Sequence, residues 1–221
     1  MQAIFESLFD IFYLTTVTFL GLRMVREGKD RQYFLFGLMA LVLGLGDAFH
    51  LVPRALALNT TGLENWTFAL GLGKLITSIT MTIFYLILYY VWRLRYKIRD
   101  KKGLSFLIWI LSILRISLVL CPENMFLSIN SPFAWAIYRN IPFTILGLLI
   151  IIIFYKKSRE EGDLAFKNLW LTIVLSFGFY LPVVLFEKTI PLIGILMIPK
   201  TCAYIWTILI GYWAMKGENN D

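Results

Sequence analysis

The chain has 221 residues, of which 59% are hydrophobic and only 16% are charged. A soluble domain of this length carries nearer a quarter charged residues, so the composition excludes a soluble fold and favours a protein embedded in lipid. The formal net charge of +7 does not indicate nucleic-acid binding, because a chain without a soluble fold offers no basic surface for nucleic acid.

Seven apolar stretches, each about long enough to cross a bilayer, lie between charged or Pro/Gly/Asn-rich breaks. In chain order they cover residues 4–22, 33–56, 66–92, 104–121, 132–155, 166–186 and 190–215. The first stretch begins with acidic residues and lacks a basic leader, so we expect it to stay as a helix rather than to be a signal peptide. We therefore predict an all-α, polytopic membrane protein with residues 1–221 forming a single seven-helix membrane domain.

The basic residues predict how this domain is oriented. Most of the 21 Lys and Arg residues fall in the breaks after the first, third and fifth spans and in the tail, at 23–31, 93–102, 156–167 and Lys216. Because basic loops stay on the cytoplasmic side, we expect the N-terminus outside and the C-terminus in the cytoplasm of a multi-pass cell-membrane protein. Anionic lipids are the expected contacts of these loops.

A weak internal similarity suggests a 3+1+3 pseudo-repeat of the helices. The third and seventh spans each carry a lysine in their outer part, Lys74 and Lys200, and each is followed by a tyrosine, Tyr85 and Tyr212. Small transporters are built from such repeats. The spacings differ by one residue, and apolar sequences produce such matches easily.

The ionisable residues within the spans all fall in their outer halves. These are Asp10, Asp47, His50, Arg54, Lys74, Arg115, Arg139 and Lys200. A charge in hydrocarbon costs at least about 2.5–3.5 kcal/mol, so charges at one depth are expected to converge on one another, on water or on a ligand. Arg54 and Lys74 could instead reach the outer interface with their long side chains, and the deeper cations could form a structural ion-pair network. We favour a polar pocket open to the outside.

The second span carries the densest polar segment and the candidate catalytic residues. Asp47 and His50 are three residues apart and Arg54 follows four later, so the three share one helix face. Asp47 is expected to accept a hydrogen bond from His50 and fix its tautomer, and Gly44 and Gly46 permit close helix approach. Such a pair serves as general base and orienter, or it is an inert buried hydrogen bond.

The other candidate site residues are mainly cations, which predicts the charge of the ligand. Arg139 and Asn140 lie together in the fifth span, and Lys200 and Tyr204 lie together in the seventh. The predicted ligand-binding set is Arg54, Lys74, Arg115, Arg139, Asn140, Lys200, Tyr204 and Asp10. Because its bases outnumber the acids Asp10 and Asp47, we expect a carboxylate or phosphate ligand, carried by a small molecule or a lipid head group.

Several chemistries are not expected. A single histidine cannot build a multi-histidine zinc site, and Cys121 and Cys202 form neither a metal motif nor a disulfide framework. The sequence contains no Walker loop, dinucleotide fingerprint or GxSxG elbow. We predict no metal, no cofactor and no nucleic-acid partner.

The seventh span carries Lys200, and the sixth is aromatic and contains Tyr180 and Pro182. These last two spans resemble those of microbial rhodopsins. That resemblance covers two helices and implies retinal bound to Lys200. The third span lacks the acidic counterion of that family, which leaves only Asp47 or Asp10 for the role.

Three broader hypotheses stay open. The chain is a membrane-embedded enzyme that acts on an amphiphile, a transporter of a small organic anion, or a receptor whose basic loops engage a partner. One-sided polarity counts against the transporter, because a carrier also needs a route through the inner half, although Tyr, Ser and Thr side chains could line one.

Overall fold

The computed structural model describes residues 2–128 and 131–220. It is 86% helical, without strands in this described part, and contains seven helices long and apolar enough to span a membrane. They are α1 (Gln2–Glu27), α2 (Arg31–Asn59), α3 (Thr67–Arg95), α4 (Lys102–Leu120), α5 (Phe133–Glu160), α6 (Leu169–Phe186) and α7 (Met197–Asn220). The predicted all-α class and the predicted number of seven such helices are confirmed.

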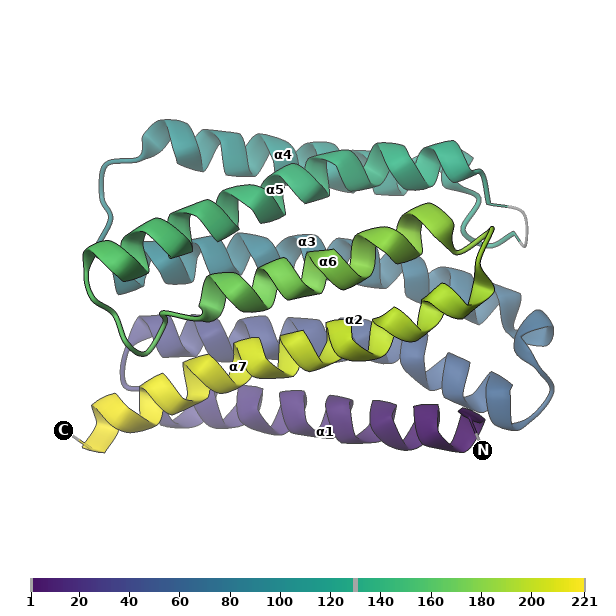
Figure 1. The fold of residues 1–221 in the computed structure, drawn as a ribbon, viewed down its shortest axis with the longest axis horizontal. Coiled ribbons are helices and arrows are strands. Elements are labelled where there is room, and N and C mark those ends of the chain that lie inside the picture. The colour runs from purple at the N-terminus through teal and green to yellow at the C-terminus, as the bar shows by residue number, and fades with distance from the viewer. Residues whose placement is uncertain (1, 129–130, 221) are drawn as a thin grey trace.

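The helices run along the long axis of the molecule and alternate in direction (Figure 1). We call the end at which α1 begins the N-terminal end of the bundle, and the end at which α7 finishes the C-terminal end. The connections α1–α2, α3–α4 and α5–α6 lie at the C-terminal end, and the other three lie at the N-terminal end (Figure 1). The predicted orientation in the membrane and the pseudo-repeat stay predictions.

The seventh span begins differently from the prediction. The stretch predicted as the start of the seventh helix is a 3-10 helix, η3 (Pro191–Leu196), and α7 follows it. Lys200 therefore lies in the first turn of α7 rather than ten residues below its start. Another 3-10 helix, η1 (Leu63–Trp66), precedes α3, and a third, η2 (Pro122–Asn124), follows α4. Hydropathy alone does not separate a 3-10 turn from an α-helix, because both hold apolar residues equally well.

The helices pack mainly with their sequence neighbours, as α1–α2–α3 and as α5–α6–α7. The helices α1 and α2 contact α7, α3 contacts α5, and α4 packs on α3 and α5. The approach of α2 to α3 is close: Gly46 faces Thr80, and a Cβ atom added to Gly73 would lie 2.6 Å from the His50 Cα. The predicted role of Gly46 in close helix packing is confirmed.

Candidate functional site

Polar side chains from all seven helices meet inside the N-terminal half of the bundle. We call this set the interior cluster: Tyr13, Asp47, Tyr85, Arg115, Asn140, Tyr180, Lys200 and Tyr204. Five of these were predicted site residues, and the three tyrosines Tyr13, Tyr85 and Tyr180 were not among them. A tyrosine in an apolar span is normally interpreted as a core residue. Its hydroxyl is the only part of the side chain that could have indicated a place in a polar cluster.

Asp47 and His50 do not form the predicted pair. The Tyr13 hydroxyl donates a 2.7 Å hydrogen bond to Oδ2 of Asp47. The Nδ1 atom of His50 lies 3.4 Å from the carbonyl oxygen of Leu70 instead. The two residues share one face of α2, but α1 packs on one side of that helix and α3 on another. Each side chain therefore turns to a different neighbour, and the expected acid–base pair is not assembled.

Lys200 lies almost wholly inside the bundle, with 8% of its surface exposed. Its Nζ atom is 4.9 Å from the centroid of the Tyr180 ring and 5.3 Å from that of Tyr204. Asp47 and Arg115 are its nearest charges, yet Lys200 has no ion pair within the described chain. Aromatic faces partly replace water around an ammonium, at about 0.5–2 kcal/mol per contact.

Arg115 is the most deeply buried cation of the cluster, with 2% of its surface exposed. Its guanidinium carbon is 3.1 Å from the centroid of the Phe143 ring, and Tyr85, Tyr180 and Tyr204 lie around it. Its Nε and Nη1 atoms have no hydrogen-bond partner. A buried donor left unpaired costs about 1–3 kcal/mol, and more when it is charged. This guanidinium is therefore the group in the cluster that most clearly lacks hydrogen-bond acceptors.

Asn140 and Tyr204 complete the cluster around these cations. Asn140 is 5% exposed, accepts a 2.8 Å hydrogen bond from the Tyr180 hydroxyl and donates to the Ala136 carbonyl. The Tyr204 ring packs edge-on against Phe84 at 5.8 Å. These contacts hold Tyr180 and Tyr204 in place beside Lys200.

Three predicted site residues lie nearer the N-terminal end. Arg54 forms a 3.1 Å ion pair with Glu6. Asp10 is half-buried on α1, within electrostatic reach of both. Lys74 is exposed on α3. The sequence left open whether Arg54 reaches the interface or a site, and its acidic partner on α1 now accounts for its charge.

Arg139 connects the loop after α4 with α5. Its Nη1 atom donates a 2.8 Å hydrogen bond to Oδ1 of Asn124, and its guanidinium lies 4.8 Å from the Phe126 ring centroid. Asn124 is 1% exposed and also donates to the carbonyl oxygens of Leu118, Val119 and Cys121. The sequence analysis missed Asn124, because a loop asparagine gives no sign of burial.

A pocket of about 360 Å3 opens between α3 and the α5–α6 pair at the N-terminal end. Lys74, Arg139 and Lys188 line it together with Glu64 and Glu187, and apolar side chains such as Phe133 complete its wall. Lys74 and Arg139, predicted to share a site, thus face one pocket. Arg139 is also within electrostatic reach of Arg115, so the pocket lies beside the interior cluster.

No family model, curated protein or solved structure matches this chain. Its site is therefore interpreted from its own chemistry. Among residues 2–128 and 131–220, no group of three His, Cys, Asp or Glu side chains is placed to hold a metal ion.

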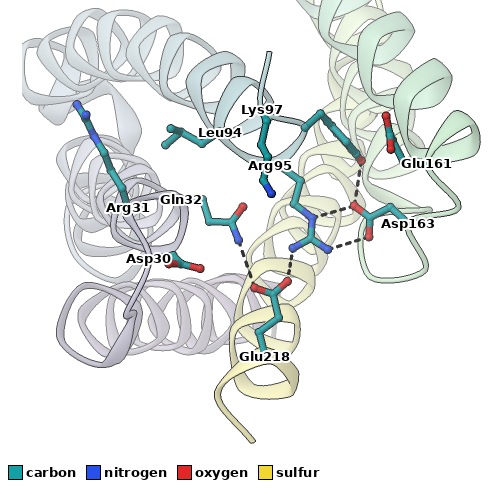
Figure 2. A pocket seen from close by; sticks show the side chains of 10 residues that line it. Asp30, Arg31, Gln32, Leu94, Arg95, Lys97, Glu161, Asp163 and Glu218 are labelled. Carbon is teal, nitrogen blue, oxygen red and sulfur yellow. Dashed lines mark hydrogen bonds and ion pairs between the residues drawn. The ribbon is translucent and has the colours of Figure 1, made fainter. Parts of the chain in front are cut away.

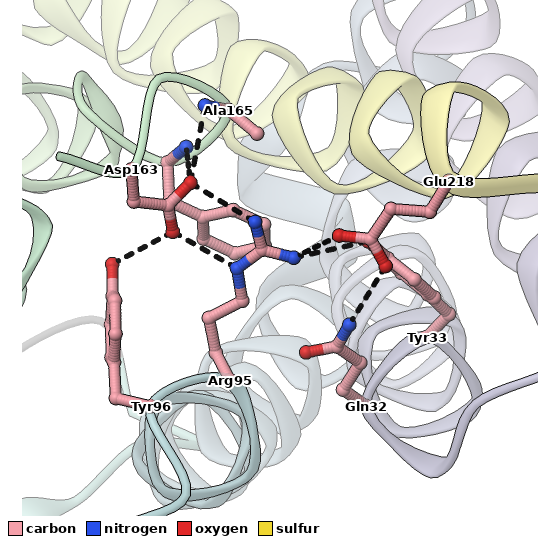
Figure 3. Close-up of polar contacts among 8 residues, drawn as sticks. Gln32, Tyr33, Arg95, Tyr96, Asp163, Ala165 and Glu218 are labelled. Atoms are coloured by element: carbon pink, nitrogen blue, oxygen red, sulfur yellow. Dashed lines mark hydrogen bonds and ion pairs between the residues drawn. The ribbon is translucent and has the colours of Figure 1, made fainter. Parts of the chain in front are cut away.

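A second polar site, not among the predicted ones, lies at the C-terminal end. Arg95, the last residue of α3, donates from Nε and Nη2 to both oxygens of Asp163 at 2.9 and 3.0 Å, and from Nη1 to Glu218 (Figure 3). Gln32 donates to Glu218, and Tyr96 donates to Asp163. We call these five residues the C-terminal network. Its members are up to 186 positions apart in sequence, so no local pattern announces it.

Burial and ion pairing set the ionisation of this network. Burial of the Asp163 carboxyl would raise its pKa, but the hydrogen bonds and charge of Arg95, together with hydrogen bonds from the Phe166 N–H and the Tyr96 hydroxyl, outweigh burial and hold that pKa below its usual value. Burial, together with the neighbouring Asp163 charge, raises the pKa of Tyr96 well above its usual value. Asp163 is therefore a carboxylate and Tyr96 a neutral donor at physiological pH. A pocket of about 710 Å3 lies over the network, with Arg31, Lys97 and Glu161 on its wall (Figure 2).

Proposed function

We propose that this chain is a multi-pass cell-membrane protein that binds an anion at the interior cluster. The ligand carries a carboxylate or phosphate group, on a small molecule or on a lipid head group. The observation that carries this proposal is Arg115, a buried guanidinium whose Nε and Nη1 atoms have no acceptor. Both atoms need oxygen acceptors, and carboxylate and phosphate oxygens are the strongest acceptors for a guanidinium N–H.

The charge balance around Arg115 supports an anionic ligand. Lys200 is within electrostatic reach of one carboxylate, Asp47, and of a second cation, Arg115, while Arg139 adds a further cation near Arg115. Inside a bilayer, a surplus of buried cations is costly unless a counter-charge arrives. The pocket with Lys74 and Arg139 on its wall offers a cationic approach from the N-terminal end.

We propose that this end faces the outside of the cell. Exposed lysines and arginines such as Arg26, Lys29, Lys102 and Arg159 gather at the C-terminal end, which suits the cytoplasmic side. Binding rather than turnover is the function proposed, since Asp47 and His50 each contact another residue. An enzyme would need a different pair of groups for acid–base chemistry.

Native mass spectrometry with lipid analysis tests the proposal on detergent-purified protein. Wild type is compared with Arg115→Gln and with Lys102→Gln, which removes an exposed charge from the same helix. We expect wild type and Lys102→Gln to retain one anionic species that Arg115→Gln loses. Its mass separates a lipid from a soluble anion. Equal retention in all three would overturn the proposal.

If wild type is isolated empty, thermal unfolding replaces retention as the readout. Inorganic phosphate and phosphatidylglycerol are added separately, so that a free anion and a lipid head group are distinguished. Stabilisation at 100 times the dissociation constant amounts to about 2.7 kcal/mol. We expect this stabilisation in wild type and in Lys102→Gln and its loss in Arg115→Gln. No stabilisation of wild type by either probe contradicts a site for such head groups.

A further inference from the structure

The ion pairs between the two helix groups α1–α3 and α5–α7 are distributed unevenly along the bundle. In the part of the chain that the structure describes, they are Arg95–Asp163, Arg95–Glu218 and Lys216–Glu27. All three lie at the C-terminal end (Figures 1 and 3). At the N-terminal end the Arg54–Glu6 pair stays within one group. Within residues 2–128 and 131–220, the ion pairs that tie the two groups together thus lie at the C-terminal end.

Both pockets lie on the seam between these two groups. The N-terminal pocket has α3 on one side and α5 and α6 on the other. The C-terminal pocket has the α1–α2 turn and the end of α3 on one side, and the α5–α6 loop and Glu218 on the other. The larger pocket, about 710 Å3, ends on the C-terminal network (Figure 2). A recess with charged walls therefore opens on the seam at each end, with more bases than acids at the N-terminal end and with Arg31, Arg95 and Lys97 among acids at the C-terminal end.

Between the recesses the seam is closed by aromatic rings rather than by charges. Tyr85 packs edge-on against Phe143 with ring centroids 5.2 Å apart, and its ring centroid lies 5.6 Å from that of Phe177. Tyr85 and Tyr204 both place their hydroxyls near Ser176, so polar groups continue along the seam. Aromatic edges give way by rotamer changes, whereas the three ion pairs fix the distance between the helix groups.

We infer that the C-terminal network is the closed gate of an anion passage along this seam, which makes the chain a carrier with the interior cluster as its binding site. This inference rests on the proposed function, since the gate matters only if an anion occupies the cluster. Release of Arg95 from Asp163 and Glu218 lets the C-terminal ends of α3 and α7 separate. The cluster then opens to the C-terminal side.

The network has the properties that a gate requires. Its Glu218 side chain is 41% exposed and stands in the last turn of α7, so its pair with Arg95 is reversible. The Asp163 pair is more enclosed, with side-chain exposures of 17% for Arg95 and 7% for Asp163. An anion that reaches the pocket from the interior competes with Glu218 for the same guanidinium edge. Opening is then coupled to the ligand.

Thiol accessibility in lipid nanodiscs tests the gate. Cys121 and Cys202 are replaced by serine, and Ala214→Cys serves as reporter, because Ala214 is buried on α7 one turn from Glu218. A membrane-impermeant maleimide measures its rate of labelling. Arg95→Gln removes the gate, and Lys102→Gln removes an exposed charge at the same end of the bundle, on α4. Ala165→Cys, exposed in the α5–α6 loop, gives the unhindered rate.

We expect Arg95→Gln to accelerate labelling of Ala214→Cys at least about tenfold, while Lys102→Gln leaves it unchanged. A second buried reporter, Ala40→Cys on α2, detects general loosening, and its rate should stay low in both backgrounds. Unchanged labelling at Ala214 in a folded Arg95→Gln protein overturns the gate. So does equal acceleration at Ala40, which means partial unfolding.

This test is independent of the ligand assay. Anion retention that depends on Arg115, combined with unchanged Ala214 labelling, rejects the gate and leaves the binding site. A gate that opens in a protein without an Arg115-dependent anion rejects the proposed ligand and leaves the conformational change.

Discussion

The guanidinium carbon of Arg115 lies 3.1 Å from the centroid of the Phe143 ring, while its Nε and Nη1 atoms lack acceptors. The aromatic contact stabilises the cation by about 0.5–2 kcal/mol. Two unpaired buried donors cost about 1–3 kcal/mol each. Without a ligand the balance at Arg115 is therefore unfavourable, as is common where a binding site is maintained at the expense of stability.

Replacing Arg115 by methionine should therefore stabilise the ligand-free protein, by roughly 1–3 kcal/mol. The methionine side chain fills similar space against Phe143 and needs no acceptor. Thermal unfolding in detergent, after removal of bound anions, measures the change. The matched control is Arg139→Met. It removes the hydrogen bond that Arg139 donates to Asn124, so it should destabilise the protein. A destabilised Arg115→Met protein would show that Arg115 already has the partners it needs.

The hydrogen bond from Tyr13 to Asp47 should contribute to the stability of the protein. Tyr13→Phe leaves the Asp47 carboxylate without its 2.7 Å donor. Because hydrogen bonds to charged groups contribute about 1.5–3 kcal/mol, we expect a loss of stability in this range. Tyr138→Phe, at an exposed position on α5, should change stability by less than about 0.5 kcal/mol. If the two variants behave alike, the contact is energetically unimportant.

A double-mutant cycle with Asp47→Asn isolates this contact. The coupling energy between Tyr13 and Asp47 is expected to be about 1 kcal/mol or more. Additive effects of Tyr13→Phe and Asp47→Asn would mean that each residue acts through other neighbours.

The sequence was sufficient to predict the seven helices and the charged residues that lie inside the bundle, for a physical reason. A bilayer imposes a fixed length on each span, and a charge within a span is conspicuous. Arg115, Lys200 and Asp47 could be found on this ground, and they do meet in the interior cluster. Their tyrosine partners could not, because hydropathy does not distinguish a tyrosine that packs from one that donates.

The pairing of side chains depends on how neighbouring helices are placed, which one sequence does not encode locally. Asp47 and His50 share a face of α2, yet α1 and α3 supply their partners. Arg95 belongs to a basic loop that signals topology, and its acidic partners are 68 and 123 residues away. For the same reason the sequence did not predict the C-terminal network, whose members come together only in the folded structure.

Asn124 gives a prediction about the loop that holds Arg139. Its side chain is 1% exposed, donates to three carbonyl groups at the end of α4 and accepts from Arg139. Asn124→Ala removes all of these bonds and leaves buried carbonyls unpaired, so we expect destabilisation of about 2–3 kcal/mol. Asn65→Ala, at an exposed position of η1, is the control and should change little. An Asn124→Ala protein as stable as wild type would mean that water replaces the amide.

Asp163 gives the prediction about pH, because its pKa in the folded protein is held below the usual carboxyl value by Arg95. A depressed pKa contributes stability that is fully present above the unfolded value, about 3.9, and is lost as the pH falls through the lower folded value. At pH 7, Asp163→Asn should be less stable than wild type by about 3 kcal/mol, the cost of breaking an enclosed ion pair. Below pH 4 this difference should shrink, since the unfolded wild-type chain then binds a proton at Asp163 while the folded protein still holds the carboxylate.

Unfolding measured across pH 7 to 3 tests this, with Asp100→Asn, exposed at the same end, as the control. The control should follow wild type throughout. A stability gap between wild type and Asp163→Asn that stays constant to pH 3 would mean that the carboxylate charge does not hold the network together, because neutralising it would then change nothing. A gap that closes in acid ties the network, and the gate inferred from it, to the charge on Asp163.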